Sequence, residues 1–138
     1  MPDMANRAGS MPASSLTSDD IRRVPPDASL RVVAQVMSDS DVGLLVVGSG
    51  DEVAGVVSER DLVRAIAAER DPLTTCASDI AHGEIAWCDL TATVSEVATE
   101  MMEQYVRHVL VEDAGRLVGV ISARDLLGVY TAGDDPGA

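Results

Sequence analysis

The chain of 138 residues contains no lysine and no phenylalanine, and aromatic residues make up only 2% of it. The ten basic residues are therefore all arginines, which excludes a Walker-type lysine for phosphate and a lysine Schiff base. Without phenylalanine, the core has to be built from Val, Leu, Ile, Ala and Met. Two cysteines, Cys76 and Cys88, are too few for a disulfide framework.

Positive charge is scarce as well, since 23 acidic residues outnumber the ten arginines and give a net charge of −13. Nucleic acids and anionic membranes attract basic surfaces, so we expect neither as a partner. The first residues form no apolar signal core, and no apolar run approaches the length of a membrane span. We therefore expect a cytoplasmic protein, and the richness in Ala, Val, Asp and Arg is typical of a GC-rich bacterial source.

The chain does contain an internal repeat, which appears when it is aligned with itself at a shift of 64 residues. Residues 53–62 then fall without a gap on residues 117–126, and about a quarter of all paired positions are identical. Two copies, 13–66 and 77–130, fill most of the chain and are joined by a linker over 67–76. At this length we expect the copies to share one compact body, with any site occurring as a related pair.

Each copy is predicted to fold in the order strand, helix, strand, strand, helix. Ser29 and Thr93 are in place to cap the first helix of each copy, and Ser58 opens the second helix of the first copy. The terminal segments have little to bury, so we expect disordered tails over 1–12 and 131–138. The strands with assigned ranges are 21–24, 43–47, 53–57, 107–111 and 117–121, and the helices are 29–39, 59–69, 93–104 and 123–130.

The pattern Gly-x-x-Ser-x-x-Asp occurs once in each copy, at residues 55–61 and 119–125, where the last strand meets the last helix. Together with the order of elements and the tandem repetition, this motif resembles the CBS domain pair, or Bateman module, over residues 13–130. The resemblance implies an α/β (α+β) fold in which two β-α-β-β-α repeats pack with pseudo-twofold symmetry into one compact module. It also implies clefts between the repeats that bind adenosine-containing ligands, and frequent dimerisation.

The family pattern assigns the motif aspartates, Asp61 and Asp125, to the ribose hydroxyls of such a ligand. It assigns the motif serines, Ser58 and Ser122, to ribose or phosphate oxygens. A carboxylate can accept from two vicinal hydroxyls, and a helix N-terminus offers free N–H groups to a phosphate. The same residues also fit a capping box, which needs no ligand. The sequence leaves both interpretations open.

Basic residues distinguish the second copy from the first. Arg107 and His108 begin the strand predicted at 107–111 and come directly before its apolar residues 109–111. Family members often place basic residues that face phosphate at this position. Their counterparts, Gly43 and Leu44, carry no charge. The resemblance therefore implies that phosphate binds more strongly beside the second motif. For His108 alone, a partly buried strand histidine is an equal alternative.

Four other residues near the motifs each have two interpretations. Arg60 and Arg124 lie inside the motifs and fit either a phosphate contact or an exposed helix charge. Val42 and Val106 are expected to line the pocket walls or, more simply, to belong to the core.

The family also places the base of the ligand against the first strand of the partner repeat. Ala86 is a small residue at that position and should face the first motif. Its counterpart, Arg22, should face the second motif. A long charged side chain there departs from the family pattern and would either fill the adenine pocket or swing out to contact a phosphate.

Residues with metal or catalytic chemistry do not form a recognisable pattern. Cys76, His82 and Cys88 are evenly spaced, but they lack the Cys-x-x-Cys pair of a closed zinc site, so we expect no metal. The sequence contains no arrangement that resembles a catalytic triad or a pair of catalytic carboxylates. We therefore do not expect an enzyme.

The overall expectation is a stand-alone regulatory module that binds AMP, ADP, ATP or S-adenosylmethionine and signals occupancy to a separate, unidentified partner protein. The adenine nucleotide is a ligand here and not a catalytic cofactor. A homodimer is expected, because the four long helices carry more apolar surface than one module hides. The alternative is a structural or protein-interaction CBS pair that has lost ligand binding, with Arg22 plugging one cleft and Gly43-Leu44 weakening the other.

Overall fold

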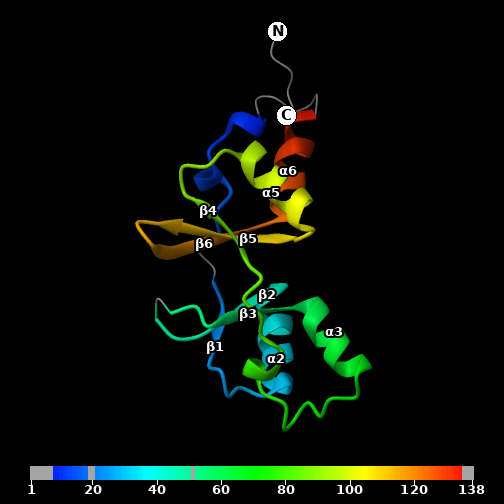
Figure 1. Cartoon of the computed structure of the whole chain (residues 1–138). Coiled ribbons are helices and arrows are strands. Elements are labelled where there is room, and N and C mark those ends of the chain that lie inside the picture. The colour runs from blue at the N-terminus through cyan, green and yellow to red at the C-terminus, as the bar shows by residue number, and fades with distance from the viewer. Residues whose placement is uncertain (1–7, 19–20, 51, 135–138) are drawn as a thin grey trace. The chain divides into compact units, whose positions relative to one another are not determined.

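The computed structural model describes residues 8–18, 21–50 and 52–134, and it divides the chain into two compact units. Unit 1 consists of Met1–Asp20 and Ala86–Ala138, whereas unit 2 is the continuous segment Ile21–Ile85. Each unit contains one three-stranded sheet and its own helices (Figure 1). The fold is therefore α/β with two small sheets, as the repeat predicts. No helix in the described part of the chain is long and apolar enough to cross a membrane.

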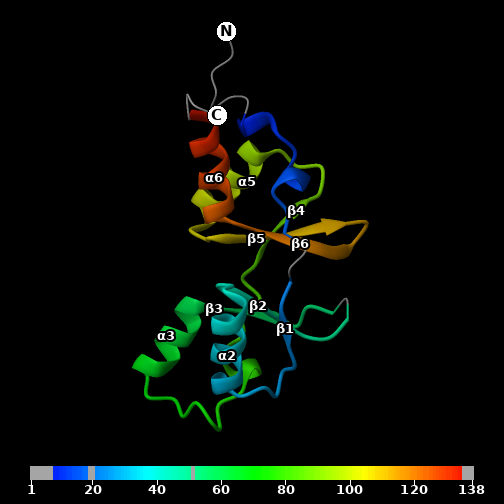
Figure 2. The ribbon, with the colours of Figure 1, turned by 180° about the vertical axis from the view of Figure 1, so that it is seen from behind.

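Unit 2 carries the elements of the first motif. Its sheet has the order β1-β2-β3, with β1 parallel to β2 and β2 antiparallel to β3. Helices α2 and α3 lie on the same face of this sheet (Figures 1 and 2). The core of this unit contains Leu45, Val47 and Val57 of the sheet, none of which is more than 1% exposed. The elements are β1 (Arg23–Val24), α2 (Leu30–Ser40), β2 (Leu44–Val47), β3 (Gly55–Ser58), α3 (Glu59–Ala67) and α4 (Ala77–Ile80).

Unit 1 repeats this plan around the second motif. Its sheet has the order β4-β5-β6, again with one parallel and one antiparallel pair, and α5 and α6 lie on one face (Figure 1). Val94 and Val97 of α5 pack against Val109 and Ile121 of the sheet, and all four are fully buried. The elements are η1 (Ala13–Ser15), β4 (Ala86–Asp89), α5 (Val94–Gln104), β5 (His108–Asp113), β6 (Arg116–Ser122) and α6 (Ala123–Asp134).

The predicted helix caps are confirmed. The Ser29 side chain accepts a hydrogen bond from the backbone N–H of Val32 at 3.2 Å, which caps α2. The Thr93 side chain does the same for α5 by accepting from Glu96 N–H at 3.2 Å. A side-chain oxygen at this position satisfies one of the free donors of the first turn, so serine or threonine begins the helix at that residue.

The leading segment of each copy is incorporated in the compact unit of the other copy. Ser18 exchanges two backbone hydrogen bonds of 3.0 Å with Val120 of β6. In the same way, His82 donates to Val56 of β3 at 3.1 Å and accepts from it at 3.0 Å. The sequence repeats 13–66 and 77–130 therefore do not coincide with the compact units. Sequence similarity marks where a copy begins, but it does not determine which sheet the first residues join.

The glycine of each motif makes room for this added segment. A Cβ atom on Gly119 would overlap Thr17 Cγ2 and lie 2.6 Å from the Ser18 carbonyl oxygen. A Cβ on Gly55 would lie 3.0 Å from the His82 carbonyl oxygen. The distance at Gly119 is shorter than real Cβ contacts, whereas the distance at Gly55 is tight and would require a small shift of the neighbouring backbone. Close approach of a neighbouring backbone thus explains why the motif begins with glycine.

The described residues include part of each predicted tail. The Met11 carbonyl accepts from Val94 N–H at 2.8 Å, and Ala8 is only 5% exposed, so residues 8–12 are packed onto unit 1. At the other end, α6 continues to Asp134. The ends of the tails at 1–12 and 131–138 stay a prediction. Residues 1–7 and 135–138 lie outside the described part of the chain.

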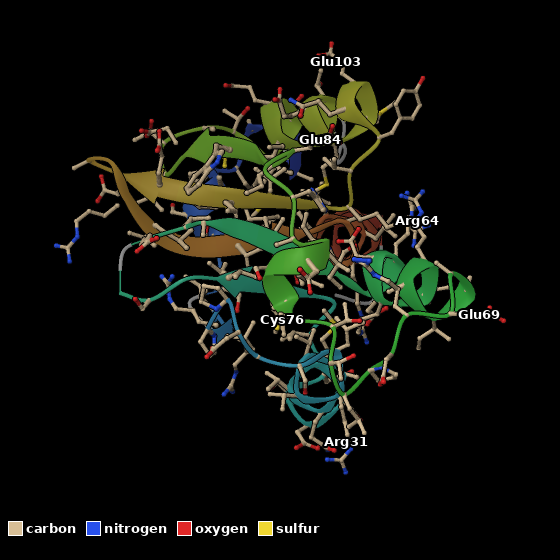
Figure 3. All side chains as sticks on the ribbon, turned by 60° about the horizontal axis from the view of Figure 1, so that its bottom comes forward. Arg31, Arg64, Glu69, Cys76, Glu84 and Glu103 are labelled. Atoms are coloured by element: carbon tan, nitrogen blue, oxygen red, sulfur yellow. The ribbon has the colours of Figure 1, made fainter. Side chains whose placement is uncertain are left out.

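The predicted linker over 67–76 is attached to the start of α2. The Thr75 carbonyl accepts from Leu30 N–H at 3.0 Å, and the Pro72 carbonyl accepts from Arg31 N–H at 3.1 Å. Figure 3 shows Arg31 pointing away from the ribbon at this end of the helix, and Cys76 at the start of α4. The linker therefore satisfies backbone donors of the first turn of α2.

Candidate functional site

The second motif forms a compact polar cluster at the start of α6. The Ser122 N–H donates to Asp125 Oδ2 at 2.9 Å, and the Asp125 N–H donates to Ser122 Oγ at 3.1 Å. Ser122 is the last residue of β6 and Asp125 lies in the first turn of α6, so the strand-to-helix junction fixes both side chains. Both residues are half-buried. These reciprocal hydrogen bonds are those of a capping box.

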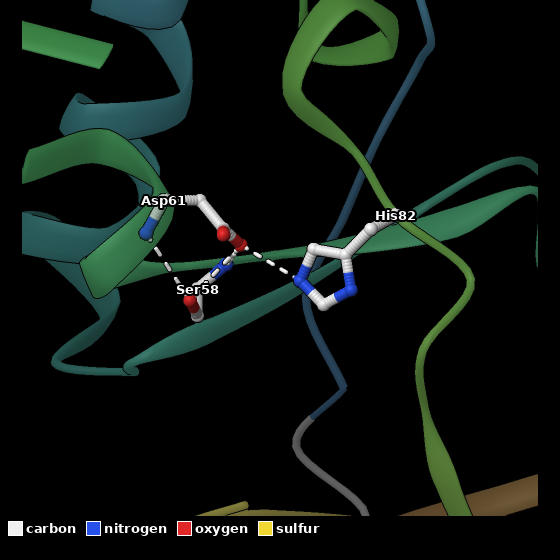
Figure 4. A network of polar contacts seen from close by, with 3 residues as sticks. All are labelled: Ser58, Asp61 and His82. Atoms are coloured by element: carbon white, nitrogen blue, oxygen red, sulfur yellow. Dashed lines mark hydrogen bonds and ion pairs between the residues drawn. The ribbon is translucent and has the colours of Figure 1, made fainter. Parts of the chain in front are cut away.

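The first motif forms the same cluster at the start of α3 (Figure 4). The Ser58 N–H donates to Asp61 Oδ2 at 2.7 Å, and the Asp61 N–H donates to Ser58 Oγ at 3.3 Å. Ser58 Oγ also donates to Asp61 Oδ2 at 2.9 Å. Figure 4 shows a third residue, His82, whose Nε2 lies 3.0 Å from the same carboxylate oxygen.

The capping interpretation of both motifs is thus confirmed, and it leaves acceptor capacity for a ligand. Among the described residues, every hydrogen bond to the Asp61 and Asp125 carboxylates falls on Oδ2. The second oxygen, Oδ1, has no hydrogen-bond donor at either position within the same described residues. Capping and ligand contact are therefore compatible, because a carboxylate has about four acceptor sites on two oxygens. Contact with a ligand stays a prediction.

Basic residues lie beside the second cluster and are absent from the equivalent positions of the first. The Arg107 carbonyl accepts from Ala123 N–H at 2.8 Å, and His108 of β5 is paired with Ser122 of β6. In unit 2 the corresponding carbonyl is that of Gly43, at 3.0 Å from Glu59 N. The backbone geometry is thus the same in both units, but the side chains differ. The strand that leads to the second cluster therefore carries an arginine and a histidine, where the first has glycine and leucine.

The arginines inside the motifs, Arg60 and Arg124, are exposed residues in the first turns of α3 and α6. Val42 and Val106 are half-buried and pack against the cores of unit 2 and unit 1, respectively. The core interpretation of these two valines is therefore confirmed. A contact of any of the four residues with a ligand stays a prediction.

Ala86 and Arg22 each belong to a different compact unit from the motif assigned to them. Ala86 is 3% exposed and lies in β4, where it is paired with Val109. Arg22 is exposed, and its carbonyl accepts from Val46 N–H at 2.9 Å in unit 2. The backbone therefore places them at corresponding positions of the two sheets. Their role toward a ligand remains a prediction.

His82 is the polar contact that sequence reasoning missed. The sequence singled it out only as an evenly spaced neighbour of the two cysteines, whereas the structure brings it to Asp61. Its Nδ1 is buried and has no hydrogen-bond partner among the residues that the structure describes, and its side chain is 38% exposed. The 64-residue register aligns His82 with Ser18, but no pattern in the sequence connects either residue with a motif aspartate.

The cysteines, Cys76 and Cys88, are both free thiols. Within the described part of the chain, no three His, Cys, Asp or Glu side chains are close enough together to hold a metal ion. Burial, followed by repulsion from Asp89, Glu100 and other nearby acids, raises the pKa of the Cys88 thiol to about 11. This shift makes the Cys88 thiol a weaker nucleophile at neutral pH than an ordinary cysteine.

The sequence and the fold of this chain are similar to those of known proteins. Hypoxic response protein 1 from Mycobacterium tuberculosis is 35% identical over 100 residues, which cover 71% of this chain and 70% of that protein. A crystal structure of Hypoxic Response Protein I with two coordinated zinc ions is 30% identical and has a TM-score of 0.72, over 86% of this chain and 98% of the other. The cluster of ligands that such ions need is not found among the residues described for this chain.

A second solved structure contains a nucleotide. It is a CBS domain protein from Pyrobaculum aerophilum complexed with AMP, with 33% identity and a TM-score of 0.75 over 88% of this chain and 99% of that one. The family model of the CBS domain matches this chain twice, at residues 13–68 and 77–132. The chain therefore belongs to the CBS domain family and is a tandem pair of CBS domains, which is a regulatory module.

Proposed function

We propose that this module binds an adenosine-containing ligand, namely AMP, ADP, ATP or S-adenosylmethionine, at the start of α6 and reports its occupancy to a partner protein in the cytoplasm. The ligand is bound and released without chemical change. Asp125 accepts hydrogen bonds from the ribose hydroxyls, while Ser122 and the basic side chains of Arg107 and His108 face the phosphate. The relative complexed with AMP, at 33% identity, supports this choice of ligand class.

The observation that carries the proposal is the arrangement of charge at the start of α6. One carboxylate oxygen of Asp125 is used by the cap, and the other has no donor among the described residues. Arg107 is connected to the first residue of the helix by the hydrogen bond from Ala123. A helix N-terminus favours an anion through its free N–H groups and dipole. A ribose with an attached phosphate matches this combination of acceptor and positive charge.

Thermal unfolding with AMP, ATP, S-adenosylmethionine and GMP tests the proposal. A ligand at one hundred times its dissociation constant stabilises the folded chain by about 2.7 kcal/mol. For a domain of this size, that corresponds to a rise in Tm of roughly 5–10 °C. We expect this rise with at least one adenosine-containing ligand and a smaller one with GMP.

The variant Asp125→Asn separates ligand binding from capping. Its amide oxygen still accepts from Ser122 N–H, but its NH₂ group cannot accept from a ribose hydroxyl. We expect a loss of affinity of roughly tenfold or more, measured by calorimetry, with little change in Tm without ligand. Asp79→Asn is the matched control, because Asp79 Oδ2 accepts from Cys76 N–H at 2.8 Å in the cap of α4. Arg107→Ala should weaken AMP more than adenosine.

Two results would contradict the proposed function. An unchanged Tm with all adenosine-containing ligands would favour the alternative, a CBS pair that serves only structure or protein interaction. A ligand-induced shift that persists unchanged in Asp125→Asn would show that the ligand binds elsewhere.

We also propose that the module is a homodimer formed through its helices. Val63 and Ile66 of α3 are 66% and 65% exposed, and Leu127 of α6 is 67% exposed. Val63 and Leu127 occupy equivalent positions of the two repeats. Each unit therefore carries an exposed apolar residue at the same place on its last long helix, α3 or α6. Apolar residues that are left in water in this way are typical of an association surface.

A further inference from the structure

The two motif aspartates differ in how many donors they already accept. Asp61 Oδ2 receives three hydrogen bonds, from Ser58 N–H, Ser58 Oγ and His82 Nε2, at 2.7, 2.9 and 3.0 Å. Asp125 Oδ2 receives one, from Ser122 N–H at 2.9 Å. A carboxylate that accepts from two vicinal hydroxyls usually presents both of its oxygens. At Asp61 one oxygen is saturated by the protein itself.

We propose that His82 is the residue that makes the two sites unequal: it occupies the Asp61 carboxylate in place of a ribose hydroxyl, so that a diol-bearing nucleotide binds at Asp125 and not at Asp61. This inference rests on the proposed function and deepens it, because it assigns the stoichiometry and the selectivity of the same pair of sites. His82 acts through Asp61 and is therefore a positioning residue.

Backbone hydrogen bonds of His82 position its imidazole beside Asp61. Its N–H and carbonyl are both paired with Val56 of β3, at 3.1 and 3.0 Å. Gly55 lets this segment approach the strand, because a Cβ there would lie 3.0 Å from the His82 carbonyl oxygen. The residue therefore enters the cluster from a segment whose backbone is bridged to β3.

The tautomer of the ring follows from its two nitrogens. Nε2 faces the acceptor Asp61 Oδ2, whereas Nδ1 is buried and has no hydrogen-bond partner in the described part of the chain. A buried N–H without an acceptor is unfavourable, so the neutral ring carries its proton on Nε2 and donates it to Asp61. The histidine thus presents to the carboxylate the same kind of donor that a ribose hydroxyl would present. Protein and ligand compete for one oxygen.

The second repeat supplies the natural comparison. Ser18 is the residue equivalent to His82, and it pairs with Val120 as His82 pairs with Val56. Among the described residues, the Asp125 carboxylate accepts no hydrogen bond from this segment. The backbone pairing is therefore the same at both sites, and the side chains at this position differ. Replacing His82 with serine, the residue at the equivalent position, removes the histidine donor from Asp61 and leaves the two donors of Ser58 in place.

Calorimetric titration with AMP measures the effect as a number of bound molecules per chain. We expect one AMP per wild-type chain, lost in Asp125→Asn, and two per His82→Ser chain, with the second affinity within about tenfold of the first. The double variant His82→Ser with Asp61→Asn should return to one. His82→Gln is the conservative control, because its amide N–H can still donate to Asp61, and it should bind one.

The possible outcomes separate this inference from the proposed function. One AMP in both wild type and His82→Ser overturns the role of His82 and leaves binding at Asp125 intact. Two AMP molecules in the wild type also overturn it. No binding by either chain overturns both proposals.

Histidine NMR gives a second measurement that does not depend on the stability of the serine variant. The chain has only two histidines, so the His82 ring signals are assigned by their loss in His82→Gln. We expect nitrogen shifts of the Nε2–H form in the wild type, with the Nε2 proton slowed in exchange by Asp61. In Asp61→Ala, which removes the acceptor, this protection should fall at least several-fold. A ring protonated on Nδ1, or one unaffected by Asp61→Ala, would contradict the assignment.

Discussion

At the scale of single residues, one carboxylate can perform two tasks because it has two oxygens. In both motifs Oδ2 accepts the hydrogen bond of the helix cap. Oδ1 receives no hydrogen bond from any described residue. Sequence alone predicts the cap and the ligand contact equally well, since Ser-x-x-Asp is required by both. The sequence could not predict how many donors each oxygen already has, because His82 reaches Asp61 through tertiary structure.

The thiol of Cys88 gives a prediction about alkaline stability. Burial, then repulsion from nearby acids, raises its pKa from 9.0 to about 11, and this means that the folded state holds the proton more tightly. Below pH 9.0 both states are protonated and nothing changes. As the pH rises from 9.0 to about 11, only the unfolded chain loses the proton, so the folded state becomes less stable.

Cys88→Val removes this titration, and valine is the residue at the equivalent position, Val24. Over the same pH range we expect the Tm of the wild type to fall further than that of the variant. Cys76→Val is the control for removal of a thiol in general. Parallel Tm curves for wild type and Cys88→Val would contradict the prediction.

At the scale of elements, the glycines of the motifs determine how closely the leading segments approach the sheets. Gly119→Ala places a Cβ against Thr17 and 2.6 Å from a backbone oxygen, whereas in Gly55→Ala the nearest atom lies at 3.0 Å. Overpacking against backbone costs about 1–3 kcal/mol. We expect Gly119→Ala near the upper end of that range and Gly55→Ala near the lower end.

Urea unfolding measures both losses. Gly83→Ala is the matched control, because nothing lies within 4 Å of the added Cβ, and its free energy of unfolding should stay within about 0.5 kcal/mol of the wild type. Equal stability of Gly119→Ala and the wild type would mean that residues 17–18 do not lie against β6 in solution.

The order of elements and the helix caps could be predicted from sequence because they depend on local patterns. Ser29 and Thr93 precede apolar residues at helical spacing, and both cap a helix in the structure. The exchange of the leading segments could not be predicted in this way. Ser18 and His82 belong to corresponding places in two similar copies, and either sheet offers nearly the same partner strand. Only the packing decides between them.

At the scale of the whole molecule, the exposed apolar side chains predict self-association. We expect sedimentation equilibrium at micromolar concentration to give a dimer, and the double variant Val63→Glu with Leu127→Glu to give a monomer, because charges at an apolar interface lose their hydration. Leu73→Glu is the control, since Leu73 is equally exposed, at 70%, but lies outside the helices. A monomeric wild type, or dissociation by Leu73→Glu, would contradict the proposed interface.

The discontinuous make-up of unit 1 has a consequence for synthesis on the ribosome. Unit 2 ends at Ile85, so all of its strands have been translated before the sheet of unit 1 begins. The segment around Ser18 is made early, yet its partner, Val120, is added about a hundred residues later, and contacts of such long separation form slowly. In a growing chain, unit 2 can therefore fold before unit 1 has all of its residues. A nascent chain that ends before residue 120 leaves the segment around Ser18 without the strand that it pairs with.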